Sequence, residues 1–248
     1  PYNDYMGNFT QIGHMGGYYY NDNWGASQPT FEANIGGDIV VEANGAININ
    51  SSGKKGTAII GHGGYNYTLG SGIVSGDITV TAGSITLSGV VDPSPSISGS
   101  NSPAKIGSFI ADGGAIGSDI SVTAKGNISL TGGGNGGAWA QIGHGDGTIS
   151  QVSIVQSNIT VSGQDITLTG GSGGNSSAKI GHGFNNDYNF YDFVNVSNSN
   201  ISVTASGTLK TTDGSGSGSE ARIENRASSM SANDVTLQAK NFSNTSSN

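Results

Sequence analysis

The chain has 248 residues, of which 33% are hydrophobic, 43 are glycine and none is cysteine, and its formal net charge is -8. The absence of cysteine excludes a disulfide framework and a thiolate metal site, and the negative charge argues against nucleic acid or an anionic membrane as a partner. The apolar residues are mainly Ile, Val and Leu in short alternating patches, which predicts an all-β chain and not a disordered one.

The first predicted element is a strand that runs into a turn rich in glycine and histidine, QIGHMG at residues 11–16, and we call it the IGHG motif. It recurs at residues 59–64, 104–109, 140–145, 178–183 and 221–226. Ser108 and Asn225 take the place of histidine in two of these copies. The remaining copies contain every histidine of the chain: His14, His62, His144 and His182.

Two further patches lie between successive IGHG motifs. The GDI motif is GDIVVEA at residues 37–43 and recurs at 76–82, 118–124, 157–163 and 199–205. The ITL motif follows it and begins at residues 46, 84, 127, 165 and 208. In GDITVTA the side chains of Ile78, Val80 and Ala82 share one face of a strand, and Thr79 and Thr81 share the other. Each unit therefore predicts strands with a buried aliphatic face and an outer face of Ser and Thr.

The isoleucine of the IGHG motif recurs every 36 to 48 residues, a period typical of solenoids and propellers. Since no aromatic signature marks a propeller blade, we predict a parallel β-helix (β-solenoid) with variable-length loops and about six repeat units. Residues 1–248 are expected to form one segment, an internal fragment of a longer repeat protein. A short apolar patch before the GDI motif, as at residues 152–154, leaves open whether a unit is one coil or two. Residues 92–103 and 214–219 are expected to be loops that tolerate deletion.

The succession GDIxVxA, IxLxG and A[KQ]IGHGG, over about residues 10–240, resembles the repeats of large bacterial adhesins of the filamentous haemagglutinin type. The resemblance implies a secreted β-helical fibre protein that leaves the cell through a partner outer-membrane transporter. It also implies a structural and adhesive function at the cell surface or in the extracellular matrix, in attachment, aggregation or biofilm formation.

The histidines are interpreted as a structural column. In AQIGHG, alternation places Ala140, Ile142 and His144 on the inward side or at the corner that ends it, and the flanking glycines suit a sharp turn. Imidazoles at such a corner can bond turn carbonyls. The alternatives are a metal ladder, which needs converging nitrogens and which Ser108 interrupts, and a catalytic role. We expect no metal and no cofactor.

Aspartates stand before strands, as Asp38 and Asp77 do, at positions where Asn158 and Asn200 replace them in other units. This exchange fits Asx turns and backbone capping and would abolish general acid catalysis, so no enzyme activity is expected. The alternative function is a carbohydrate-active β-helix enzyme, a polysaccharide lyase or hydrolase. The nearest match to a calcium-binding nonapeptide, at residues 143–146, is single and out of register. The outward threonines resemble the arrays of ice-binding solenoids, but Ser, Val and Glu interrupt them.

Aromatic residues gather in the segments that follow the IGHG motif. Because this motif stacks on itself, these loops are expected to emerge along one edge and to present their rings to a polysaccharide or cell-surface glycan. Alternatively, the rings form satellite cores that pin their own loops. The candidate ligand-binding residues are Tyr18, Tyr19, Tyr20, Trp24, Tyr65, Tyr67, Phe184, Tyr188 and Tyr191.

The residue before the isoleucine of the IGHG motif is basic in three of six units, as Lys105, Lys179 and Arg222. Alternation turns it outward, where it is expected to keep an outer face soluble, with a column for an anionic polysaccharide as the alternative. Lateral self-association into fibres is a further expected contact. Neither nucleic acid binding nor membrane insertion is expected, and the chain is expected to be secreted.

Overall fold

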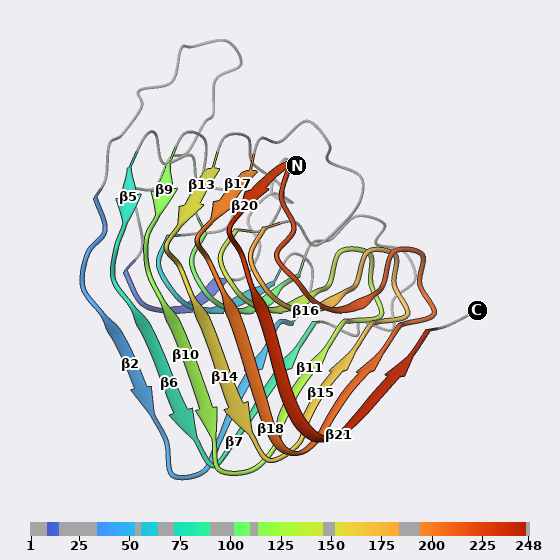
Figure 1. The fold of residues 1–248 in the computed structure, drawn as a ribbon. Coiled ribbons are helices and arrows are strands. Elements are labelled where there is room, and N and C mark those ends of the chain that lie inside the picture. The colour runs from blue at the N-terminus through green and yellow to red at the C-terminus, as the bar shows by residue number, and fades with distance from the viewer. Residues whose placement is uncertain are drawn as a thin grey trace, which may run out of the picture.

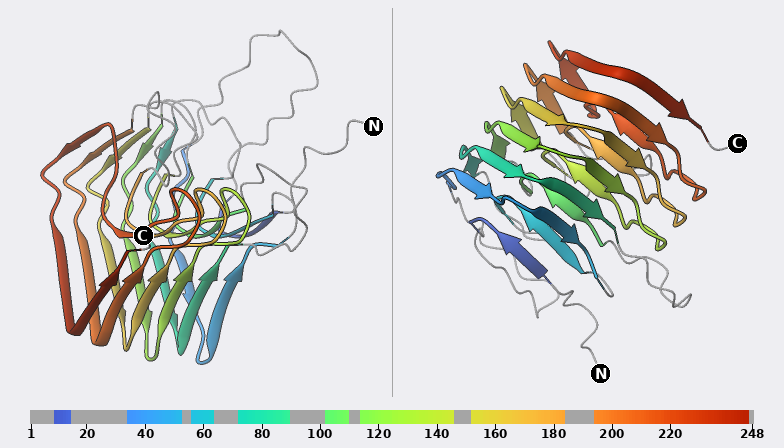
Figure 2. Two further views of the ribbon diagram at one scale, coloured as in Figure 1. Left: turned by 90° about the vertical axis from the view of Figure 1, so that its right-hand side faces the viewer. Right: turned by 90° about the horizontal axis from the view of Figure 1, so that it is seen from below.

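The computed structural model describes residues 9–14, 34–52, 56–63, 72–89, 102–109, 114–145, 152–183 and 194–246. These residues form a parallel β-solenoid and contain no helix, so the predicted fold class is confirmed. Figure 1 shows the coils following one another in sequence order from blue to red, and Figure 2 shows the same stack from the side and from below. Among the described residues, no helix has the length and apolarity needed to cross a membrane.

The IGHG motifs stack as a parallel sheet of six strands, which we call the IGHG sheet. Each strand pairs in register with its copy in the next unit, so that Ala140 lies opposite Ala178 and Ile142 opposite Ile180. The strands are β1 (Phe9–Ile12), β4 (Thr57–Ile60), β8 (Ala104–Ile106), β12 (Ala140–Ile142), β16 (Ala178–Ile180) and β19 (Ala221–Ile223).

The GDI and ITL motifs form a sheet of ten strands that is bent into two arms. It is continuous because two strands, β18 (Ile201–Thr212) and β21 (Val235–Thr245), run through both arms. The first arm also contains β2 (Ile39–Glu42), β6 (Ile78–Ala82), β10 (Ile120–Ala124) and β14 (Ile159–Gly163). The second arm also contains β3 (Ala46–Asn50), β7 (Ser84–Ser88), β11 (Ile128–Thr131) and β15 (Ile166–Thr169).

A third sheet of five short strands precedes the first arm. Its strands are β5 (Ile73–Val74), β9 (Ala115–Ile116), β13 (Val152–Val155), β17 (Val194–Ser197) and β20 (Ser229–Ser231). Each unit therefore makes one coil, in the order third sheet, first arm, second arm and IGHG sheet. The described residues contain four complete coils, β5–β8, β9–β12, β13–β16 and β17–β19, with incomplete coils at both ends.

Aliphatic columns form the core between the arms and the IGHG sheet. Ile78, Ile120 and Ile159 lie side by side in the first arm, and all three are buried. Ile142 and Ile180 complete the same core from the IGHG sheet. Strands of this composition bury one face because their apolar side chains alternate with Ser and Thr. The predicted continuous aliphatic interior is therefore confirmed.

The glycine-rich segment at residues 214–219 is a turn outside the strands, as expected, but it packs closely against the preceding coil, which argues against the predicted tolerance to deletion. The N–H of Gly214 donates to the Ser219 carbonyl at 2.7 Å, as Gly171 donates to Ser176 one coil earlier. Ser219 is buried, and its hydroxyl accepts a 3.1 Å bond from the Ser176 N–H. A Cβ at Gly214 would collide with the carbonyl oxygen of Gly171. A composition rich in Gly and Ser, which is typical of flexible linkers, therefore forms closely packed turns here. Most of the other predicted loop, residues 92–103, lies outside the described residues.

Candidate functional site

At the turns that end the strands of the IGHG sheet, which we call the IGHG edge, a ladder of hydrogen bonds runs from coil to coil through the histidine position. The backbone N–H of Ser108 donates to Nδ1 of His144 at 3.0 Å, and the N–H of His144 donates to Nδ1 of His182 at 3.1 Å. The N–H of His182 then donates to Oδ1 of Asn225 at 3.0 Å. The rings of His144 and His182 stack with their centroids 5.1 Å apart. Each side chain therefore binds the backbone of the preceding coil.

The second nitrogen of each imidazole faces the turn before the first arm. Nε2 of His144 lies 2.9 Å from the Ser118 carbonyl oxygen, and Nε2 of His182 lies 2.7 Å from that of Ser157. Because Nδ1 accepts a backbone N–H, the proton of the neutral ring must be on Nε2, which donates to the carbonyl. Asn225 reproduces both bonds, since its Nδ2 donates to the Ser199 carbonyl at 2.6 Å.

Burial keeps these imidazoles neutral. Desolvation lowers the pKa of His182 from 6.5 to about 3, and it lowers the pKa of His144 well below 6.5, with the neighbouring His182 as a second cause. Burial also lowers the pKa of His62, whose ring stacks on His14 with a centroid distance of 5.1 Å. Both ring nitrogens of His144 and His182 are occupied by backbone partners. These two side chains are therefore committed to the ladder, and the described residues contain no group of three or more His, Asp or Glu placed to hold a metal.

A second polar column lies on the opposite face of the same strands, and here the expectation of an outward, solvated position is wrong. Lys105, Gln141 and Lys179 face away from the aliphatic core, as alternation predicts, but all three are buried. Nζ of Lys105 donates to Oε1 of Gln141 at 2.7 Å, and Nε2 of Gln141 donates to the Gly181 carbonyl at 2.8 Å. Like the histidines, Lys105 and Gln141 connect successive coils, and we call Lys105, Gln141 and Lys179 the lysine column.

Aromatic side chains lie over the Lys105 end of the lysine column. Nζ of Lys105 lies 4.5 Å from the ring centroid of Phe109 and 5.4 Å from that of Trp139. Phe109 and Trp139 pack with Ile59 in a small cluster separate from the main core. Nζ of Lys179 donates to the His182 carbonyl at 2.8 Å, and burial lowers the pKa of Lys179 well below its usual value. A second layer of side chains therefore covers this face of the IGHG sheet around Lys105.

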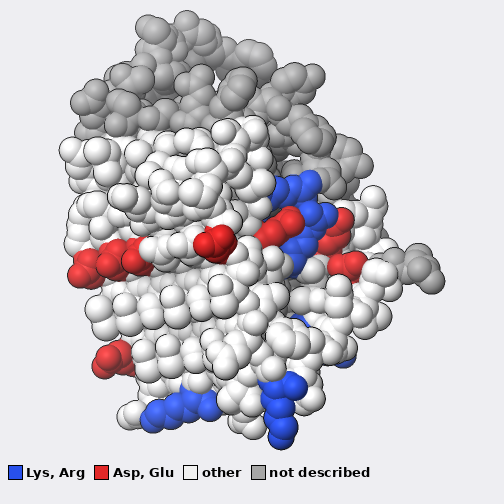
Figure 3. Space-filling model, viewed as in Figure 1, with Lys and Arg blue, Asp and Glu red and all other residues white. Residues whose placement is uncertain are grey.

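Exposed Asp and Asn side chains cap the turn that enters the first arm. Oδ1 of Asp77 accepts the N–H of Asp119 at 2.8 Å, and Oδ1 of Asp119 accepts the N–H of Asn158 at 2.7 Å. Oδ1 of Asn158 accepts the N–H of Asn200 at 3.1 Å. Asp and Asn serve equally here because only an oxygen acceptor is required. Figure 3 shows acidic side chains in a row across the stack, with a largely uncharged surface below it.

That uncharged surface is the outer face of the first arm, where hydroxyl side chains lie in register. Thr79, Ser121, Thr160 and Ser202 form one row across successive strands. Val40 stands at the position of Thr79 in β2, so the apolar interruption of this row lies at its N-terminal end. The face offers hydrogen-bond donors and acceptors at the regular spacing of neighbouring strands, about 4.8 Å.

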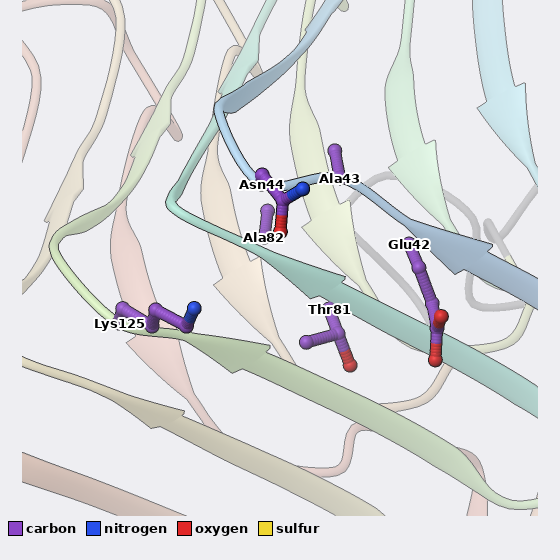
Figure 4. A pocket seen from close by; sticks show the side chains of 6 residues that line it. All are labelled: Glu42, Ala43, Asn44, Thr81, Ala82 and Lys125. Atoms are coloured by element: carbon purple, nitrogen blue, oxygen red, sulfur yellow. The ribbon is translucent and has the colours of Figure 1, made fainter.

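An open pocket of about 340 Å³ lies where the first arm turns into the second, and sequence reasoning did not identify it. Figure 4 shows Glu42 at the end of β2 and Lys125 after β10, on opposite sides of the pocket. Asn44 and Thr81 supply the other polar groups of its wall. Opposite charges near the end of the first-arm strand in different units, Glu42 and Lys125, were the available signal.

The candidate aromatic residues lie outside the described residues, so the structure does not place them. The structure does describe the residues from which these segments start, which we call their anchor points. Gly145 donates its N–H to the Ser108 carbonyl at 3.1 Å, and Gly183 donates to the His144 carbonyl at 2.8 Å. The segments that follow the IGHG motif therefore start side by side, one coil apart. The segments enter the third sheet at strands that are also stacked.

No protein-family model matches the sequence, and neither a curated protein nor a solved structure matches it. The function proposed below is therefore based on the geometry of the repeats.

Proposed function

We propose that the chain is a rigid structural segment of a secreted adhesive fibre, at the cell surface or in the extracellular matrix. One observation carries the proposal. The aliphatic columns, the histidine ladder and the row of capping Asp and Asn side chains all run through successive coils in register. A stack with both apolar packing and hydrogen bonds between all neighbours resists bending and supplies length. The resemblance of the repeats to adhesins of the filamentous haemagglutinin type supports the same function.

Contact with a glycan is assigned to the segments that follow the IGHG motif. Their stacked anchor points allow several loops to act together, so that weak stacking of about 1 kcal/mol per ring adds along the edge. Cell attachment, aggregation and biofilm formation are the processes such an edge would serve.

The test compares the native chain with a triple variant, Tyr19→Ser, Tyr65→Ser and Tyr188→Ser, which takes one ring from each of three segments. Binding to a panel of insoluble polysaccharides and cell aggregation should both fall at least tenfold, with the β-sheet circular dichroism unchanged. The matched Tyr→Phe triple variant keeps the rings and should retain binding.

Full binding by a folded Ser variant would remove the aromatic segments from the proposal. The same incubations report on the competing function, a polysaccharide lyase or hydrolase. New reducing or unsaturated ends released by the purified chain would replace the structural proposal with an enzymatic one.

A further inference from the structure

The open pocket of Figure 4 lies where one turn of the stack is shorter than its neighbours. The turn from the first arm to the second, which we call the arm corner, lies between residues that are paired in register in both arms. It comprises residues 43–46, 124–127 and 205–208 in three coils, but only 82–84 and 163–165 in the two coils between them. The corner after β6 is therefore one residue shorter than those on either side of it.

The residue that this corner lacks is the counterpart of Asn44 and Lys125. The N–H of Gly83 donates to the Gly45 carbonyl at 2.7 Å, and the N–H of Gly126 donates to the Gly83 carbonyl at 2.8 Å, so the three glycines are aligned. Asn44 and Lys125 each precede one of them and stand two strand spacings apart, about 9.6 Å, with no residue between them. The gap has chain on both sides along the stack and opens sideways, so coils added at either end would not fill it.

Four polar side chains face this gap. They supply a carboxylate, an amide, a hydroxyl and an ammonium group, from Glu42, Asn44, Thr81 and Lys125. Figure 4 shows Thr81 between the two charged side chains, as the register of β2, β6 and β10 requires. Within the described residues no ion pair joins Glu42 to Lys125. The pocket therefore offers two opposite charges and two neutral hydrogen-bonding groups to a ligand.

A ligand that uses all four groups is small, carries several hydroxyls and has one anionic group. The pocket volume of about 340 Å³ is at the lower end of the range for small-molecule sites, which suits a single sugar ring. A carboxylate on the ring can form a charge-assisted hydrogen bond with Lys125. Ring hydroxyls can donate to Glu42 and can both donate to and accept from the Asn44 amide. A free amino acid has too few polar groups to engage all four side chains.

The surface beside the pocket suits the neighbouring sugars of a chain. Thr81 is in register with Thr123, Ser162 and Thr204, so a row of hydroxyl groups leads away from the pocket across the next three strands. This row belongs to the largely uncharged surface in Figure 3. Hydroxyl side chains both donate and accept hydrogen bonds, as sugar hydroxyls do. The pocket therefore lies at one end of a surface along which a glycan can extend.

We propose that this pocket binds a hexuronic acid residue of a polysaccharide. Lys125 binds the carboxylate, and Glu42 and Asn44 bind ring hydroxyls. None of these residues belongs to the aromatic segments to which glycan contact was assigned above. The inference therefore adds a second glycan site, specific for an acidic sugar, and it does not depend on the adhesive function.

The test uses two probes that differ only in the carboxylate, methyl glucuronide and methyl glucoside, titrated into the native chain and followed by nuclear magnetic resonance. The native chain should bind the glucuronide at least tenfold more tightly than the glucoside. Lys125→Ala should remove this preference, and Lys125→Arg should keep it. Lys210→Ala is the matched control, since Lys210 is an exposed lysine of β18 outside the pocket, and it should bind as the native chain does.

A second variant closes the pocket without removing any of its side chains. An asparagine inserted between Ala82 and Gly83 gives this corner the length of its neighbours and should abolish binding of both probes. Equal affinity of the native chain for the two probes, undiminished glucuronide binding by Lys125→Ala, or no binding by the native chain would refute the proposal. Loss of glucuronide binding in the triple Tyr→Ser variant would place the site in the aromatic segments and would also overturn it.

Discussion

The two arms and the IGHG edge are both buried, yet opposite chemistry holds them together. In the first arm Ile159 and Val161 pack in aliphatic columns, whereas at the IGHG edge His144, His182 and Gln141 are equally buried and bond the backbone of neighbouring coils. Aliphatic contact is non-directional, so it stabilises the stack without fixing how one coil sits on the next. Buried polar groups lose their partners if the coils slip, so they fix the register.

The largest effect is expected from a charge in the aliphatic columns. Ile159→Asp would bury a carboxylate among Ile120, Ile201 and their neighbours, at a cost of several kcal/mol, and should leave the chain unfolded or aggregated. The neighbouring Thr160→Asp places the same charge on the outer face and should change stability by less than about 1 kcal/mol. Urea unfolding followed by circular dichroism measures both. Equal stability of the two variants would contradict a continuous aliphatic interior.

A smaller but still severe loss of stability is expected where the glycine-rich turns of neighbouring coils touch. Gly214→Ala would push a methyl group against the Gly171 carbonyl and should cost about 3 kcal/mol. Gly45→Ala is the matched control, because a Cβ at Gly45 meets no atom within 4 Å. Thermal unfolding of the two variants gives the difference. A fully stable Gly214→Ala chain would restore the interpretation of residues 214–219 as a loose loop.

Acidification should weaken the polar edge selectively. An unfolded histidine binds a proton near pH 6.5, whereas folded His182 resists protonation until about pH 3 and folded His144 also titrates well below 6.5. Below pH 6.5 the unfolded chain therefore binds more protons than the folded chain, and stability falls with falling pH. For His182 alone the loss between pH 6.5 and pH 5 is about 2 kcal/mol.

Urea unfolding of the native chain and of the double variant His144→Asn, His182→Asn, between pH 7 and pH 5, checks this dependence. The variant should lose less stability over this range, because Asn does not titrate there. A native chain whose stability is flat over the same range would show that these histidines are not held neutral by the fold.

The smallest predicted effects distinguish the hydrogen bonds of His182 from the volume that its side chain fills. His182→Ala leaves the His144 N–H and the Ser157 carbonyl without their side-chain partner and should cost about 2 kcal/mol at pH 7. His182→Asn can remake both bonds, as Asn225 does in the next coil, and should cost less than about 1 kcal/mol. Calorimetric melting temperatures rank the two variants. An Asn variant that is no better than Ala would show that volume matters more than hydrogen bonding.

The parallel β-solenoid could be predicted because its signal is local and repeated. Alternation in GDITVTA assigns Ile78, Val80 and Ala82 to one face, and a strand that repeats in every unit can bury that face only by stacking. The number of coils per unit could not be predicted, because strands such as β5 and β9 contain two residues each and have no period to detect.

The burial of the lysine column could not be predicted from the strand that carries it. Alternation correctly turned Lys105 away from the aliphatic core, but Phe109 and Trp139 belong to segments outside the strand's pattern, and they close over it. What covers the second face of a strand depends on tertiary layers, which the period of one strand does not encode. The recurrence of Lys, Gln and Lys at one register position was the only local signal.

The tautomer of the buried imidazoles tests most directly whether the IGHG edge is a structural ladder. Nitrogen-15 chemical shifts of His144 and His182 should show Nε2 protonated and Nδ1 unprotonated, and this state should persist at pH 5, where an exposed histidine is charged. Spectra of His144→Asn and His182→Asn assign the signals. An imidazolium at pH 5, a proton on Nδ1, or shifts that respond to stoichiometric Zn²⁺ would contradict the account.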